Sequence, residues 1–134
     1  MTLVRMYLIA QLAAFLGFTA FGYAAPSRFA SLLGMSLHDV TAVADFCATY
    51  GGLCAGIAVV LALGLARPAW ERPAVTLAVT ASAGLLLGRL LTIAQHGPAG
   101  PYIHGSMALE LVAALAGAWL LRGEGARQPA LRPA

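Results

Sequence analysis

Four long apolar segments alternate with short polar or proline-containing connections along this chain. A stretch of about 20 apolar residues can cross the hydrocarbon core of a membrane as an α-helix, which rises about 1.5 Å per residue. We therefore expect an all-α fold, a bundle of four transmembrane helices. Residues 1–122 should form one domain, and the polar segment 123–134 is predicted to be a disordered cytoplasmic tail. The predicted spans are residues 4–25, 40–66, 73–95 and 102–121.

The connection between the first two spans mixes polar and apolar residues, which suits a short interfacial helix lying at the membrane surface. Pro26 is favourable in the first turn of such a helix, and Gly34 can close it. Ser36 and Asp39 have the three-residue spacing of a capping box, so the second span can begin as early as Leu37.

The first span must be weighed against a signal peptide, because Arg5 precedes it and small residues follow Tyr23. Its apolar run is longer than the usual core of about 7 to 15 residues in a signal peptide. Pro26 would also come directly after the cleavage point. We therefore expect this segment to stay in the protein as a membrane span.

Small residues recur at helical spacing within the spans, which allows transmembrane helices to approach each other closely. In the second span they share a stripe with Asp45, so Asp45 is expected to face neighbouring helices rather than lipid. A homodimer through a glycine-rich face is a further expectation from this pattern. The positions expected at close helix contacts are Ala48, Gly52, Gly56, Gly84, Gly88 and Gly117.

The composition agrees with a membrane protein, since 60% of the residues are hydrophobic and 10% are charged, against roughly 25% charged in soluble domains. The net charge of +3 comes from scattered arginines rather than from a concentrated basic face, which argues against a nucleic-acid partner. Arginine is most frequent near the chain ends and between the second and third spans. By the positive-inside rule, both termini are expected in the cytoplasm.

Three charged residues lie inside the spans, where charges are costly: Asp45 in the second, Arg89 in the third and Glu110 in the fourth. The predicted topology places all three in the outer half of the membrane. We expect Arg89 and Glu110 to face each other inside the bundle, and Asp45 can join them. Such a cluster has one carboxylate in excess, which could be protonated, bind a cation or receive a ligand. Alternatively, the pair only fixes the register of two helices.

Three histidines, His38, His96 and His104, also map to the outer side. With Asp39 or Asp45 they could ligate a divalent metal, but the glycine- and proline-rich spacing of the last two fixes no ligand geometry, so a metal site is the less favoured alternative. We expect all three near the membrane interface, with His96 and His104 as candidate ligand contacts. Cys47 and Cys54 are seven residues apart on one helix, too distant for a disulfide, and should pack as small apolar residues.

Three motifs carry a resemblance to a known family: TYGGLCAG at Thr49–Gly56, LLLGRLLTIAQHG at Leu85–Gly97 and LELVAALAGAWLLR at Leu109–Arg122. Over nearly its whole length the chain resembles the bacterial membrane family named domain of unknown function 4345. The resemblance implies four spans in a bacterial inner membrane but no particular reaction. In the turn, His96 stands where an acidic residue is expected before Gly97. The positions that match the family pattern are Tyr50, Gly51, Gly52, Gly88, Arg89 and Glu110.

These features favour a binding or accessory membrane protein whose outer polar pocket holds a small amphipathic, lipid-like ligand or a partner helix. The alternative is a membrane-embedded enzyme or proton-linked carrier, in which Glu110 or Asp45 titrates and Arg89 tunes it. The sequence contains no recognisable nucleophile motif, phosphate loop or metal motif, so an enzyme is less favoured and no cofactor is expected. The candidate ligand contacts are Arg89, Glu110, Asp45, Tyr50, His96 and His104.

Overall fold

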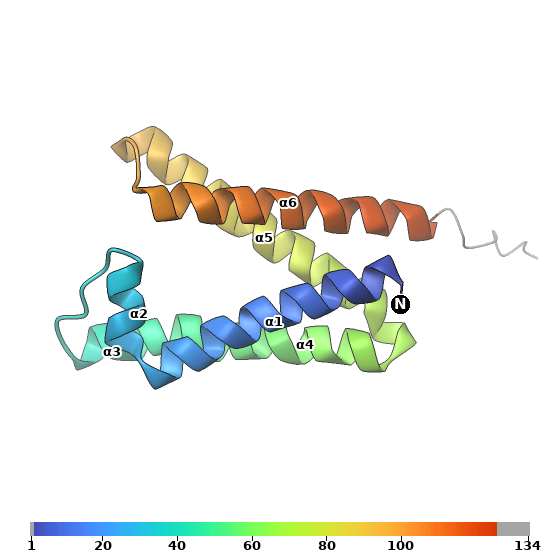
Figure 1. Ribbon diagram of the computed structural model, residues 1–134, viewed down its shortest axis with the longest axis horizontal. Coiled ribbons are helices and arrows are strands. Elements are labelled where there is room, and N and C mark those ends of the chain that lie inside the picture. Colours follow the sequence, from blue (N-terminus) through green and yellow to red (C-terminus); the bar gives the residue numbers. More distant parts are fainter. Residues whose placement is uncertain (1, 126–134) are drawn as a thin grey trace, which may run out of the picture.

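The computed structural model describes residues 2–125 of the 134-residue chain and, over that range, consists of helices joined by short loops (Figure 1). The elements are α1 (Leu3–Ala24), α2 (Pro26–Leu32), α3 (Val40–Phe46), η1 (Cys47–Leu53), α4 (Cys54–Ala66), α5 (Pro68–His96) and α6 (Pro101–Gly125). α3, η1 and α4 follow one another without a break, and η1 is π-helical. These three elements therefore form a single long helix.

Four helices are long and apolar enough to cross a membrane, which confirms the predicted all-α, four-span architecture and indicates an integral membrane protein. Residues 123–125 continue α6 beyond the predicted end of the domain. The rest of the predicted tail, residues 126–134, lies outside the described residues. The four spans are Leu3–Ala24, Val40–Ala66, Pro68–His96 and Pro101–Gly123.

The turn between α4 and α5 is a single residue, Arg67. Because it precedes a proline, Arg67 disfavours the helical region, and it adopts an extended backbone with φ −133° and ψ 119°. Pro68 then occupies the first position of α5, where its missing N–H would have had no partner in the helix. The helix that carries the third span therefore starts at Pro68, before the predicted start of the span at residue 73.

The predicted short helix between the first two spans is present as α2, with Pro26 at its first position. Gly34 follows it with φ 76°, a left-handed conformation that glycine adopts readily. The predicted capping box is wrong, because Asp39 itself is the N-cap of α3 and accepts a hydrogen bond from the backbone N–H three residues later at 2.7 Å. The second span consequently begins at Val40 and not as early as Leu37.

The helices pack around α1, α4 and α5 (Figure 1). α1 packs against η1 and α4, while α5 packs against both α4 and α6. The start of α1, the α4–α5 turn and the end of α6 lie at one end of the molecule. The opposite end carries the connection 25–39 and the α5–α6 loop 97–100, and we call it the loop end.

The best-packed part of the bundle lies where α1, α4 and the first half of α5 meet. Tyr7 of α1 also reaches α6 here, since its hydroxyl donates a hydrogen bond to the backbone oxygen of Ala113 at 3.1 Å. Gly117 of α6 is buried against Tyr7 and Val79, which leave no room for a side chain. The buried residues of this core are Leu8, Phe15, Cys54, Ala58, Leu61, Ala74, Val75 and Ala78.

A second, smaller cluster lies at the loop end and is aromatic. Phe29 of α2 contacts Phe46 of α3 and Tyr50 of η1, with ring centroids 5.6 and 5.2 Å away. These contacts hold α2 against the second span. At the same end, α5 and α6 diverge from α2 and α3 (Figure 1). The loop end therefore consists of two separately packed halves.

Candidate functional site

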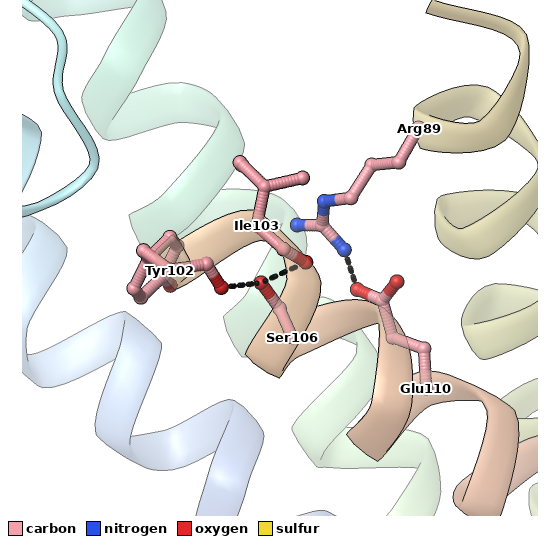
Figure 2. Close-up of polar contacts among 5 residues, drawn as sticks. All are labelled: Arg89, Tyr102, Ile103, Ser106 and Glu110. Atoms are coloured by element: carbon pink, nitrogen blue, oxygen red, sulfur yellow. Dashed lines mark hydrogen bonds and ion pairs between the residues drawn. The ribbon is translucent and has the colours of Figure 1, made fainter. Parts of the chain in front are cut away.

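An ion pair lies inside the α5–α6 half of the molecule. Nη1 of Arg89, from α5, contacts Oε1 of Glu110, from α6 (Figure 2). Both side chains are mostly withdrawn from the surface, with exposed fractions of 23% and 12%. The contact confirms the prediction that these residues face each other, and it offsets the cost of holding each charge within a span.

The hairpin of α5 and α6 brings the two charges to a similar depth. Gly97 ends α5 with φ 96°, a conformation that favours glycine, and the chain turns back within residues 97–100. Arg89 precedes the end of α5 at residue 96 by seven positions, and Glu110 follows the start of α6 at residue 101 by nine. Both residues therefore lie about 10 to 14 Å from the loop along their helices.

A groove of about 320 Å³ opens beside Arg89. Its walls are mostly apolar, and Arg89 is the charged residue among them. Thr92 adds a hydroxyl, which donates its hydrogen to the backbone oxygen of Gly88 at 2.9 Å and so keeps only acceptor capacity. The lining residues, which define the Arg89 groove, are Leu85, Gly88, Arg89, Thr92, Ile93, Ala99 and Ile103.

Tyr50 brings the second span close to this site. It belongs to η1, a π-helical segment that the sequence pattern did not predict. Its phenol group lies within electrostatic range of Arg89 in α5 and Tyr102 in α6. η1 itself packs against α1, α3 and α4. Short π-helical segments occur frequently at functional sites, which is consistent with this placement.

Small groups hold the π-helical segment against α1. The hydroxyl of Thr19 donates a hydrogen bond to the backbone oxygen of Gly51 at 3.3 Å, and the thiol of Cys47 donates to that of Gly22 at 3.5 Å. A Cβ atom on Gly22 would lie 3.0 Å from backbone atoms of η1. In the sequence, the adjacent glycines Gly51 and Gly52 indicate that another helix can approach closely here.

Asp45 does not join the Arg89–Glu110 pair. It is exposed on α3, and within residues 2–125 no ion pair links it to Arg89. Instead it lines a separate groove of about 380 Å³ at the loop end. The predicted cluster of three charges is thus divided between two sites. The residues that define the Asp45 groove are Met35, Ser36, Leu37, Ala42, Asp45, Phe46, Thr49 and Tyr50.

The π-helical segment also changes which small residues of the second span are buried. A π turn contains about one residue more than an α turn, so it rotates the residues that follow relative to a regular α-helix. Gly51 rather than Gly52 is buried, while Ala48 and Gly56 are exposed. The stripe that was expected to direct Asp45 toward neighbouring helices is therefore absent from the described part of the second span.

The glycines of α5 and α6 that were predicted at helix contacts have different surroundings in the structure. Gly84 and Gly88 have open space beside them, and Gly88 instead lines the Arg89 groove. Gly117 is buried where α6 meets α1. Of these three glycines, Gly117 is therefore the one that lies at a close helix contact.

The three histidines lie at the loop end. His96 and His104 are exposed, and Nδ1 of each lies 3.2 and 3.1 Å from a backbone oxygen one turn earlier. His38 is exposed before α3, and none of the three lines either groove. Across residues 2–125, no three His, Cys, Asp or Glu side chains converge as a metal site. Cys47 and Cys54 are free thiols, in agreement with their spacing.

Comparison with known proteins supplies a family but no activity. The family model described as Domain of unknown function (DUF4345) matches residues 3–121, a range that contains the ion pair and both grooves. No curated protein and no solved structure matches the chain. The match confirms the resemblance seen in the sequence motifs. Interpretation of the site therefore depends on its own geometry.

Proposed function

Because the chain belongs to the DUF4345 family, a domain of unknown function, we propose from the geometry of the site that it is a membrane-embedded binding module. Its ligand is a small amphipathic molecule held in the Arg89 groove. The polar head lies at the guanidinium and the apolar part lies along the groove walls. The observation that carries this proposal is the Arg89–Glu110 ion pair beside an otherwise apolar groove.

Arg89 keeps hydrogen-bonding capacity beyond the ion pair. A guanidinium carries five N–H donors, and the contact with Oε1 of Glu110 engages Nη1. Figure 2 shows the other terminal nitrogen directed away from Glu110. Donors without a partner are costly in an apolar setting. A head group that accepts hydrogen bonds would therefore stabilise the site.

Glu110 determines the net charge of the Arg89 groove. It neutralises Arg89, so the head group meets a nearly neutral pair with directed N–H donors rather than an isolated cation. Carrying a bare anion into the membrane would be costly. The site therefore favours an uncharged acceptor, such as a carbonyl or hydroxyl oxygen, as the head group.

The walls of the groove suit an acyl or isoprenoid chain. Leu85, Ile93 and Ile103 provide branched apolar surfaces from both helices of the hairpin. Gly88 leaves open space where a larger residue would narrow the groove. The volume of about 320 Å³ falls at the lower end of the range of about 300 to 1,000 Å³ typical of small-molecule pockets. It accommodates a head group and the first part of a chain.

Native mass spectrometry of the protein in lipid nanodiscs tests this proposal. The wild-type protein is expected to retain one amphiphile per chain, and Arg89→Gln is expected to lose it. Arg122→Gln is the matched control, because Arg122 is an exposed arginine at the opposite end of the molecule. Equal retention by all three proteins, or no retained molecule in the wild type, contradicts the proposal.

We also infer that both termini are cytoplasmic and that the membrane is a bacterial inner membrane. Arg5, Arg67 and Arg122 belong to the end of the molecule opposite the loops, whereas Arg28 belongs to the loop end. Positively charged residues favour the cytoplasmic side. The Arg89 groove would then open toward the outer leaflet.

Cysteine labelling tests this orientation. In a background without the two native cysteines, a cysteine placed at Ala99 is expected to react with a membrane-impermeant maleimide on intact spheroplasts. A cysteine placed at Arg67 is expected to react only after the membrane is opened. The reverse pattern overturns the inferred orientation without bearing on ligand retention.

A further inference from the structure

The Asp45 groove differs in chemistry from the Arg89 groove. It combines apolar side chains with hydroxyl groups and two aromatic rings, and Asp45 is the charged residue of its lining. Its volume of about 380 Å³ also falls in the range of pockets that hold small molecules. The Arg89 groove presents a guanidinium that is neutralised by Glu110, whereas the Asp45 groove presents a carboxylate with no ion-pair partner among residues 2–125, which indicates that the two grooves suit different ligands.

The carboxylate of Asp45 lacks a partner within the part of the chain that the structure describes. Arg89 is paired with Glu110, and the carboxylate of Asp39 is engaged as the cap of α3. No hydrogen bond or ion pair involves the Asp45 side chain among residues 2–125. Asp45 nevertheless belongs to a strongly apolar span, six positions after the cap, which corresponds to about 9 Å along the helix. A cation in the groove would neutralise it.

Two aromatic residues share the lining of this groove with Asp45. Phe46 and Tyr50 both line the groove, and their ring centroids are 4.5 Å apart. Phe29 contacts both rings from α2 and fixes their positions. The face of an aromatic ring attracts a cation within about 6 Å, and such rings are the usual recognition element for alkylated ammonium groups.

The donor set favours an organic cation over a metal ion. Calcium takes about six to eight oxygen ligands, whereas this groove offers one carboxylate and the hydroxyls of Ser36, Thr49 and Tyr50. Zinc prefers imidazole and thiolate ligands, which are absent from the described lining. The aromatic surface would also contribute little to a strongly hydrated metal ion but would pack against alkyl groups.

We propose that the Asp45 groove binds the ammonium group of an organic amine. The carboxylate of Asp45 holds the positive charge, and the rings of Phe46 and Tyr50 contact the alkyl substituents. The ammonium group belongs either to a free amine or to the ethanolamine head of a phospholipid, which share this chemistry. The site is separate from the Arg89 groove and does not depend on what that groove holds.

Tetramethylammonium binding, followed by saturation-transfer NMR, tests the proposal in nanodiscs made only of phosphatidylglycerol. Empty discs give the background from the lipid. The wild-type protein is expected to bind the probe saturably, and Asp45→Asn is expected to weaken binding about tenfold or more through loss of the ion pair. Asp39→Asn is the matched control, because it removes the same charge six positions earlier in the chain while asparagine still caps the helix. It should bind as the wild type does.

A second variant, Phe46→Leu, and a second lipid, phosphatidylethanolamine, test the role of the aromatic ring and the source of the ammonium group. Phe46→Leu keeps every charge and is expected to weaken binding of the probe, whereas Asp45→Asn should still retain the amphiphile of the Arg89 groove. Discs that contain phosphatidylethanolamine will compete with the probe if the lipid head is the occupant, and will leave probe binding unchanged if a free amine is. Equal binding by the wild type and Asp45→Asn, or wild-type binding no greater than that of empty discs, overturns the proposal.

Discussion

The hydroxyl of Tyr7 in the first span donates a hydrogen bond to the backbone oxygen of Ala113 in the last span, at 3.1 Å and across 106 positions of the sequence. This bond and the close approach of Gly117 join α1 to α6 at the end opposite the loops. At the loop end the same helices belong to separately packed halves. The Arg89 groove lies in the half formed by α5 and α6, and the Asp45 groove lies in the half that contains α3 and η1.

Replacing Tyr7 with phenylalanine should therefore weaken the bundle without changing its shape. The substitution removes one hydrogen bond of a half-buried hydroxyl, and we expect the free energy of unfolding to fall by about 0.5 to 1.5 kcal/mol. Reversible unfolding in mixed micelles measures this change. Tyr102→Phe, at an exposed tyrosine, is the control and should leave the free energy within about 0.5 kcal/mol of the wild type.

Two glycines of α4 should respond in opposite directions to alanine. A Cβ atom on Gly64 would overlap the methyl carbon of Ala74 in α5, which is fixed to the backbone and cannot move aside. We expect Gly64→Ala to destabilise the protein by about 1 to 3 kcal/mol. Gly56 has open space around it, so Gly56→Ala should stabilise its helix by up to about 1 kcal/mol. Two shifts of the same sign in thermal unfolding would contradict this packing.

The ion pair should behave as a coupled unit in a double-mutant cycle. Glu110→Gln leaves the charge of Arg89 without compensation inside the hairpin, and we expect a loss of about 3 kcal/mol in unfolding free energy. Arg89→Gln in the same chain should recover part of that loss, with a coupling energy of about 0.5 to 3 kcal/mol. Additive effects of the two substitutions would show that the side chains do not interact.

The cap of the second span offers a local test of the structure near the Asp45 groove. Asp39→Ala removes the acceptor for the first free backbone N–H groups of α3 and should cost about 0.5 to 2 kcal/mol. Asp39→Asn should cost at most a few tenths of a kcal/mol, because asparagine caps about as well as aspartate. Hydrogen exchange at Ala42 reports on this position directly. Equal protection in the two variants would indicate that the cap lies elsewhere, for example at Ser36.

Much of the architecture follows from the sequence because the membrane limits the possible solutions. Apolar segments of sufficient length become spans, and a charge inside a span needs a partner. Arg89 and Glu110 lie on consecutive helices at similar distances from a short glycine-containing turn, which made their contact predictable. The same argument from spacing could not assign their ligand, because the walls of a groove depend on how side chains pack around it.

The position of Asp45 was predicted incorrectly from the spacing of residues along the second span. Projecting the second span as a regular α-helix placed Asp45 on one stripe with Gly52 and Gly56. The π-helical turn within residues 47–53 breaks that projection, and Gly51 becomes the buried glycine instead. Nothing in the hydrophobic pattern signals a π turn, since it changes the rotation of the helix and not its apolar character.

Site-specific photo-crosslinking tests the central proposal most directly. Benzoylphenylalanine placed at Leu85, on the rim of the Arg89 groove, is compared with the same group at Leu87, an exposed residue of α5 outside the groove. At Leu85 it should capture one discrete amphiphile, and capture should be lost in combination with Arg89→Gln. At Leu87 it should capture only bulk membrane lipid. Identical products at both positions, unaffected by Arg89→Gln, would contradict the assignment of the groove as a binding site.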